Sequence, residues 1–138
     1  MPPALVGGFL ILHGLITTVI GVGGVTKPDA PALALPAWFG WWPGQFGRSW
    51  LVDGLNMGSG AAVVGGLLWL VAGLSLIGAG LGFLGVGPLR DQWPLLAFAG
   101  GSVGLLALAV YFHPIYVIAV LINVVLVALV WGRLAPAS

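Results

Sequence analysis

Long runs of apolar residues, separated by short polar or proline-containing breaks, dominate this chain. About 20 residues at a helical rise of about 1.5 Å cross the hydrocarbon core of a bilayer, so a run of that length predicts a spanning helix. Four such runs follow one another, and we place the predicted spans at residues 4–25, 59–85, 93–112 and 114–132. The pattern predicts an all-α membrane protein, with residues 1–138 forming one membrane domain.

The breaks between the runs predict how the spans are connected. Only a few residues separate spans two and three, and His113 alone separates spans three and four. Short connections force consecutive helices to be antiparallel neighbours. Pro114 suits a first helical turn, where its missing N–H would have no helical acceptor. We therefore expect an antiparallel four-transmembrane-helix bundle in which only the first span is joined by a long segment, residues 26–58.

The long connecting segment, residues 26–58, is rich in proline and aromatic residues. Its prolines break regular helix, and tryptophan is favoured at the boundary between membrane and water. We expect an aromatic interfacial loop that forms a lid on the bundle, with its indoles at the boundary. The tryptophans of this predicted lid are Trp38, Trp41, Trp42 and Trp50.

Composition and charge exclude several function classes. Apolar residues make up 60% of the chain and charged residues 5%, against about a quarter charged in soluble domains. No basic cluster exists to bind a nucleic acid, and the absence of cysteine excludes thiolate catalysis and Cys-ligated clusters. The three carboxylates all lie in or beside loops, so neither a catalytic carboxylate pair nor an acidic metal cage is expected. These features favour a protein that is not an enzyme and has no metal site.

The basic residues give an orientation. Arg90 and Arg133 lie close to the spans, on the side that also carries both termini, whereas Lys27 and Arg48 belong to the long loop. Basic residues in short segments next to spans favour the cytoplasm. We expect a multi-pass protein of the cell inner membrane with both termini cytoplasmic.

Glycine recurs at seven-residue spacing in the first two spans. The two stripes are Gly7, Gly14 and Gly21 in span one, and Gly66, Gly73 and Gly80 in span two. In lipid, close van der Waals approach along small residues is a main source of helix association. The stripes predict that spans one and two pack closely.

A few polar side chains share a depth near the middle of the spans. They are His13, Thr17, Ser75, Ser102 and Asn123. Polar groups in a span usually face the bundle interior and mark functional candidates. One interpretation is a midplane site for an apolar ligand with one or two polar atoms, such as a quinone, an isoprenoid or a lipid headgroup fragment, with His13 as hydrogen-bond partner or proton relay. The other is a set of interhelical hydrogen bonds that fix the register.

The two histidines do not suggest a haem site. His13 lies mid-span and His113 at the end of span three, roughly 15 Å apart in depth for about ten residues of helical rise. Bis-His haem within a single chain is therefore disfavoured. We expect His113 either to cap a helix end or to lie solvated in the hairpin.

The order of four local motifs resembles a known family. These are His13-Gly14 in span one, Ser49-Trp50-Leu51 at the end of the aromatic loop, Trp93-Pro94-Leu95-Leu96 at the start of span three, and Ile122-Asn123 in span four. Together they resemble the DoxX-like group of small bacterial four-helix membrane proteins. That resemblance implies a link to quinone-coupled oxidation or redox homeostasis.

The leading functional hypothesis is a non-catalytic bundle that binds an apolar ligand, or an accessory subunit of a membrane complex. The alternative is a quinone-linked membrane oxidoreductase component of the DoxX-like type. A channel or transporter ranks third, because inverted repeats and charged pathway residues are missing from the sequence. Expected partners are membrane lipids, other membrane subunits or further copies of the chain, and not nucleic acid.

Overall fold

Helices account for nearly all regular structure in the computed structural model, which describes residues 2–30, 36–42 and 58–134. The four long helices are α1 (Pro3–Thr26), α2 (Ser59–Phe83), α3 (Trp93–Val110) and α4 (Val117–Leu134). Within the described residues, three short 3-10 turns accompany them: η1 (Ala37–Phe39), η3 (Gly87–Leu89) and η4 (Pro114–Tyr116). Counting η4 with α4, these four segments are each long and apolar enough to cross a membrane. The predicted all-α class with four candidate spans is confirmed.

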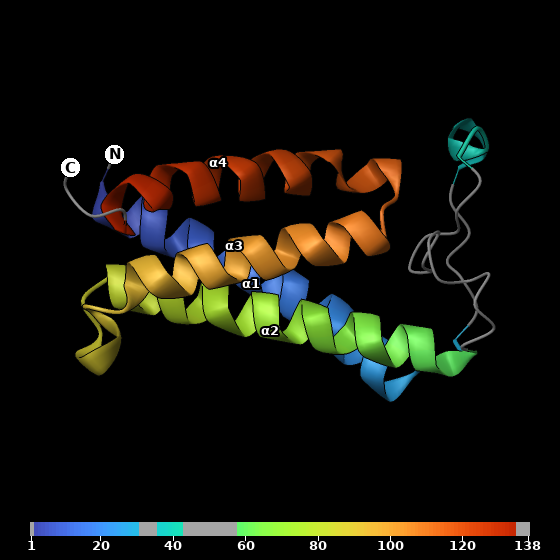
Figure 1. Ribbon diagram of the computed structural model, residues 1–138, viewed down its shortest axis with the longest axis horizontal. Helices are drawn as coiled ribbons and strands as arrows, with labels where there is room; N and C mark the ends of the chain where they lie inside the picture. Colours follow the sequence, from blue (N-terminus) through green and yellow to red (C-terminus); the bar gives the residue numbers. More distant parts are fainter. Residues whose placement is uncertain (1, 31–35, 43–57, 135–138) are drawn as a thin grey trace.

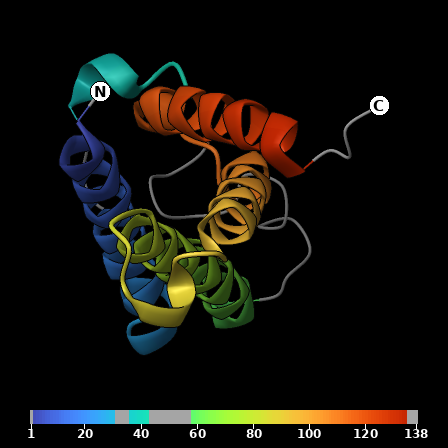
Figure 2. The ribbon, with the colours of Figure 1, turned by 90° about the vertical axis from the view of Figure 1, so that its left-hand side faces the viewer.

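The helices lie side by side, and consecutive helices run in opposite directions along the long axis (Figure 1). The start of α1, the end of α4 and the α2–α3 connection lie at one end of the molecule. Viewed from that end, the helices follow one another in chain order around the bundle (Figure 2). Within the described residues, α2 packs against α1 and α3, and α3 packs against α4, but α1 and α4 make almost no direct contact.

Two helices end earlier than the hydrophobic runs predict. The sequence places the end of span two at Gly85, whereas α2 ends at Phe83. Gly85 adopts a φ of 86°, and the Val86 N–H donates to the Leu81 carbonyl at 3.0 Å, which is the bonding pattern of a Schellman cap. Helix α3 ends at Val110, because His113 precedes a proline and adopts an extended backbone.

Glycines hold α1 and α2 in backbone contact. A Cβ atom built on Gly14 would lie 2.7 Å from the Gly73 carbonyl oxygen, and one on Gly21 would lie 2.8 Å from the Gly66 carbonyl oxygen. A Cβ on Gly80 would likewise lie 2.7 Å from the Gly7 carbonyl oxygen. The two predicted stripes therefore face each other in opposite chain directions. The prediction that spans one and two pack closely is confirmed.

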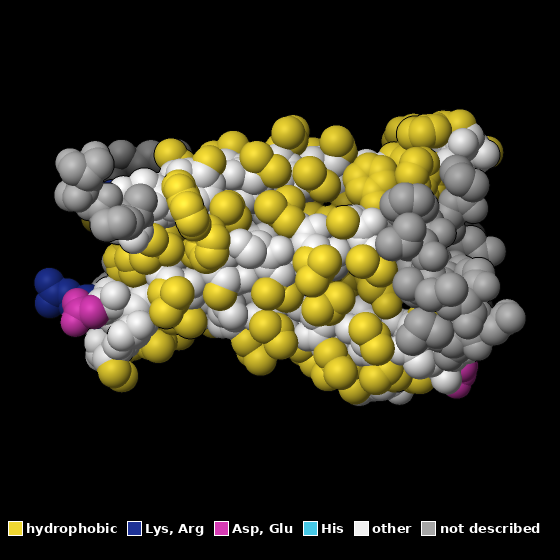
Figure 3. All heavy atoms as spheres, viewed as in Figure 1, with side chains coloured by type: hydrophobic (Ala, Val, Ile, Leu, Met, Phe, Trp, Pro, Cys, Tyr) yellow, Lys and Arg dark blue, Asp and Glu magenta, His cyan; other side chains and the backbone are white. Residues whose placement is uncertain are grey.

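The outer surface of the helices is apolar. Figure 3 shows hydrophobic side chains over the whole length of the helices, with charged side chains only at the two ends of the face in view. Large side chains such as Val19, Leu121 and Leu129 are well exposed. A soluble monomer rarely exposes apolar area on this scale. The distribution indicates a multi-pass membrane protein.

Candidate ligand pocket between α1 and α4

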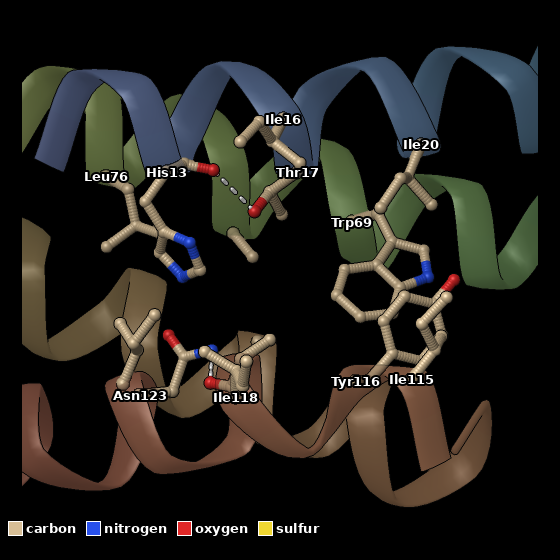
Figure 4. Close-up of a pocket in the computed structure, with 14 residues that line it drawn as sticks. His13, Ile16, Thr17, Ile20, Trp69, Leu76, Ile115, Tyr116, Ile118 and Asn123 are labelled. Atoms are coloured by element: carbon tan, nitrogen blue, oxygen red, sulfur yellow. Dashed lines mark hydrogen bonds between the residues drawn. The ribbon is translucent and has the colours of Figure 1, made fainter. Parts of the chain in front are cut away.

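The space between α1 and α4 contains a pocket of about 230 Å³. Its lining comes from α1, α2, η4 and α4, together with Gly104 of α3. Most of the lining is apolar, including Ile16 and Ile20 of α1 and Ile118 and Ile122 of α4. The pocket exists because α1 and α4 are held apart by α2 and α3, to which they are packed instead. Figure 4 shows side chains from both sides converging on it.

His13 extends into the pocket from α1. Its ring stacks on Phe9 of the previous turn, with the two planes 7° apart and the centroids separated by 6.1 Å. The imidazole points towards the Asn123 carboxamide across the pocket (Figure 4). The Nε2 atom of His13 is buried and has no hydrogen-bond partner among the described residues. His13 thus presents a polar atom to an otherwise apolar cavity.

Asn123 faces His13 from α4 and is only 2% exposed. Its Nδ2 donates to the Ala119 carbonyl oxygen at 2.9 Å, and this bond fixes which end of the carboxamide faces the helix. The Oδ1 atom is buried without a hydrogen-bond partner in the described part of the chain. Gly104 makes room for this group, since a Cβ there would lie 3.3 Å from Nδ2.

Thr17 is the third polar residue of the pocket, 5% exposed and one turn after His13 on α1. Its hydroxyl donates to the His13 carbonyl oxygen at 2.8 Å, the usual bond of a threonine within a helix. That bond uses the only donor of the hydroxyl and leaves its oxygen able to accept. Thr17 can therefore offer an acceptor to an occupant of the pocket.

Two aromatic residues form the other end of the pocket. Trp69 of α2 and Tyr116 of η4 have ring centroids 5.8 Å apart with planes tilted by 41°, and both side chains are largely buried. Figure 4 shows them together, away from the His13 and Asn123 end. The pocket is thus polar at one end and aromatic at the other.

The structure brings together three of the five midplane residues singled out from the sequence. His13, Thr17 and Asn123 line the pocket, whereas Ser75 and Ser102 are partly buried and do not line it. Ser102 lies two positions before Gly104, and two residues of helix turn a side chain by about 200°. Residues at similar depth in different spans therefore do not all point into the pocket. Sequence reasoning missed Trp69 and Tyr116, because their burial beside the pocket follows from helix packing and not from a local motif.

The aromatic residues of the predicted lid are described only in part. Trp38 and Trp41 are 72% and 69% exposed. Trp42 contacts Phe112 edge to face, with 5.2 Å between ring centroids, so the loop touches the α3–α4 connection. Trp50 lies outside the described residues. The interfacial position of this loop stays a prediction.

His113 lies at a helix end, which is one of the two positions expected from the sequence. Its Nδ1 accepts from the Ile115 N–H at 3.3 Å, at the start of η4. The side chain is buried, so the expectation of a solvated histidine is wrong. Burial lowers the pKa of His113 below its ordinary value, because the charged ring would lose its water. Its folded pKa is then below its unfolded pKa, so its stabilising effect decreases as the pH falls towards the folded value.

Within the described residues, no group of three His, Cys, Asp or Glu side chains could hold a metal ion. Comparisons with known protein families, with curated proteins and with solved structures find no match for this chain. The fold and the pocket together define a small helical protein with four candidate spans and a partly open cavity with one polar end. Its function must be inferred from that cavity.

Proposed function

We propose that this chain is an antiparallel bundle of four transmembrane helices that binds a small apolar ligand between α1 and α4, without catalysing a reaction. The observation that carries the proposal is an apolar pocket of about 230 Å³ into which two buried polar atoms, His13 Nε2 and Asn123 Oδ1, point without a hydrogen-bond partner among the described residues. Ligand sites combine apolar walls with a few placed polar groups in this way.

The charge distribution supports an orientation with both termini cytoplasmic in a cell inner membrane. The Arg133 guanidinium lies 5.3 Å from the centroid of the Trp93 ring, at the end of the bundle that carries both termini. Arg90 follows η3 at the same end. Basic residues in short segments beside spans favour the cytoplasmic side.

Topology can be tested with reporters. A reporter fused after Ser138 should report the cytoplasm, and the same reporter inserted after Asp29 should report the opposite side. Three proposed spans, α2, α3 and α4, lie between these two positions. An insertion at Gly87 should match the C-terminal fusion. Identical locations for the Ser138 and Asp29 reporters would contradict the four-span arrangement.

Ligand binding can be tested with 1-bromooctane, whose bromine quenches indole fluorescence on contact. The protein is reconstituted in nanodiscs, and the quenching of Trp69 is obtained as the difference between the native protein and Trp69→Phe. This quenching should saturate as 1-bromooctane is added. Ala119→Phe should abolish the saturable part, because Ala119 lines the pocket. Leu121→Phe is the matched control, since Leu121 lies on the exposed face of α4. Quenching that never saturates, and is equal in all variants, would contradict a binding site.

A quinone-linked role of the DoxX-like type is the second candidate function, and the position of His13 in the pocket favours it. A neutral imidazole N–H could donate to a quinone carbonyl. The absorption spectrum and the extracted lipids of the purified protein distinguish the quinone-linked role from the non-catalytic binder. A stoichiometric quinone would support the redox role, and its absence would leave the non-catalytic binder or an accessory subunit of a membrane complex.

A further inference from the structure

The polar end of the pocket has a definite hydrogen-bonding requirement. Asn123 Oδ1 can only accept, and the bond from Nδ2 to the Ala119 carbonyl prevents the carboxamide from turning over without loss. Turning it over would place two oxygen atoms against each other. An occupant that brings a donor to this position can therefore pair with Oδ1.

His13 adds a second requirement on the same side of the pocket. Its Nε2 atom, in the neutral ring, either carries the proton and donates or lacks it and accepts. Figure 4 shows the ring pointing towards Asn123, so the two side chains present their polar atoms to the same end of the pocket. A hydroxyl group is the simplest match, since it donates once and accepts at the same oxygen.

We propose that the pocket selects an apolar alcohol, meaning an uncharged molecule with one hydroxyl at the end of a hydrocarbon body. The hydroxyl donates to Asn123 Oδ1 and accepts from His13 Nε2–H, and the body lies among the isoleucines towards Trp69 and Tyr116. This inference rests on the proposed function, because it names the chemical class that the same pocket takes.

Other occupants satisfy the pocket less well. A hydrocarbon leaves both polar atoms unpaired, and a ketone or quinone has no donor for Asn123 Oδ1. An ion would lose its water in an apolar cavity without an opposite charge beside it. Water could pair both atoms, but one water needs only about 10–15 Å³ of such volume, far below about 230 Å³ with mostly apolar walls.

The test measures how four molecules of equal length displace 1-bromooctane from Trp69. They are octane, 2-octanone, octanoic acid and 1-octanol, compared at equal mole fraction in the membrane. We expect 1-octanol to displace the probe at about tenfold lower mole fraction than octane, which corresponds to about 1.4 kcal/mol. The ketone should fall between them, because it pairs only with His13.

Substitutions assign the preference to named atoms. In Asn123→Leu the advantage of 1-octanol over 2-octanone should disappear while octane still binds. In His13→Leu the advantage of the ketone over octane should disappear. Ser102→Ala is the control, since Ser102 lies at similar depth and does not line the pocket; it should change neither preference.

Each result decides the proposal. Equal displacement by all four molecules, or strongest displacement by octanoic acid, would overturn the alcohol preference while leaving an apolar binding site in place. A preference that persists unchanged in Asn123→Leu would also overturn it. If 1-bromooctane itself shows no saturable binding, the proposed function fails as well.

Discussion

Gly14→Leu should separate α1 from α2, whereas Gly8→Leu six residues earlier should leave the fold intact. A Cβ at position 14 would lie 2.7 Å from the Gly73 carbonyl oxygen and 2.8 Å from the Ile77 backbone nitrogen. Both neighbours are backbone atoms of α2 and cannot move aside as a side chain can. Overpacking a tight contact costs about 1–3 kcal/mol, and we expect the upper end of that range.

Gly8 provides a matched control because a Cβ there would meet nothing within 4 Å. Both substitutions make the same chemical change on the same helix, and leucine has a higher helix propensity than glycine by less than about 1 kcal/mol. The measurement is reversible unfolding in mixed micelles, followed by circular dichroism. Equal stability of Gly14→Leu and the native chain would show that the two helices do not meet at this position.

The glycine stripes show how much of the fold the sequence could predict. Hydrophobic length alone marked the four long helices, because the bilayer sets a minimum length for an apolar segment. The two heptad-spaced glycine stripes, one containing Gly14 and the other Gly73, then predicted which helices approach closely, because small residues permit backbone contact in lipid. Helix ends were less predictable: Gly85 ends α2 through its positive φ, which hydrophobicity does not encode.

The pocket could be predicted only in part. Depth along a helix follows directly from residue number, so the sequence places His13 and Asn123 at a similar level, and both line the pocket. The direction of a side chain around the helix depends on how each helix is rotated against its neighbours, and the apolar stripes of uniformly hydrophobic helices do not define that rotation. Ser75 and Ser102 were therefore grouped with residues that they do not join.

The separation of α1 from α4 is the feature of the pocket that the sequence does not predict. It depends on both outer helices packing on α2 and α3 rather than on each other, which is a property of the whole bundle. Trp69 and Tyr116 became pocket residues for the same reason. No local motif around either residue indicates a cavity.

His13→Leu and Asn123→Leu should each destabilise the protein by about 1 kcal/mol, and the double variant should lose less than the sum of the two. Each single change removes one of the two groups that a bound hydroxyl pairs with, and leaves the other polar atom buried in the pocket. Polar contacts of this kind in lipid are worth about 0.6–1.7 kcal/mol, which sets the size of the expected loss. Changing both residues removes both buried polar atoms from the pocket. The coupling energy from a double-mutant cycle measures this difference.

The cycle is measured by unfolding in the same micelles, with His13→Leu combined with Ser102→Ala as the control pair. The control pair should be additive, because Ser102 does not line the pocket. Additive losses for His13 and Asn123 would show that the two side chains act independently, which would remove the shared polar end of the pocket. Coupling with ligand still bound to the double variant would make the pair a structural contact between α1 and α4. Coupling together with loss of 1-octanol selectivity, while the helices stay folded, would assign the pair to ligand recognition, because only a bound hydroxyl needs both atoms at once.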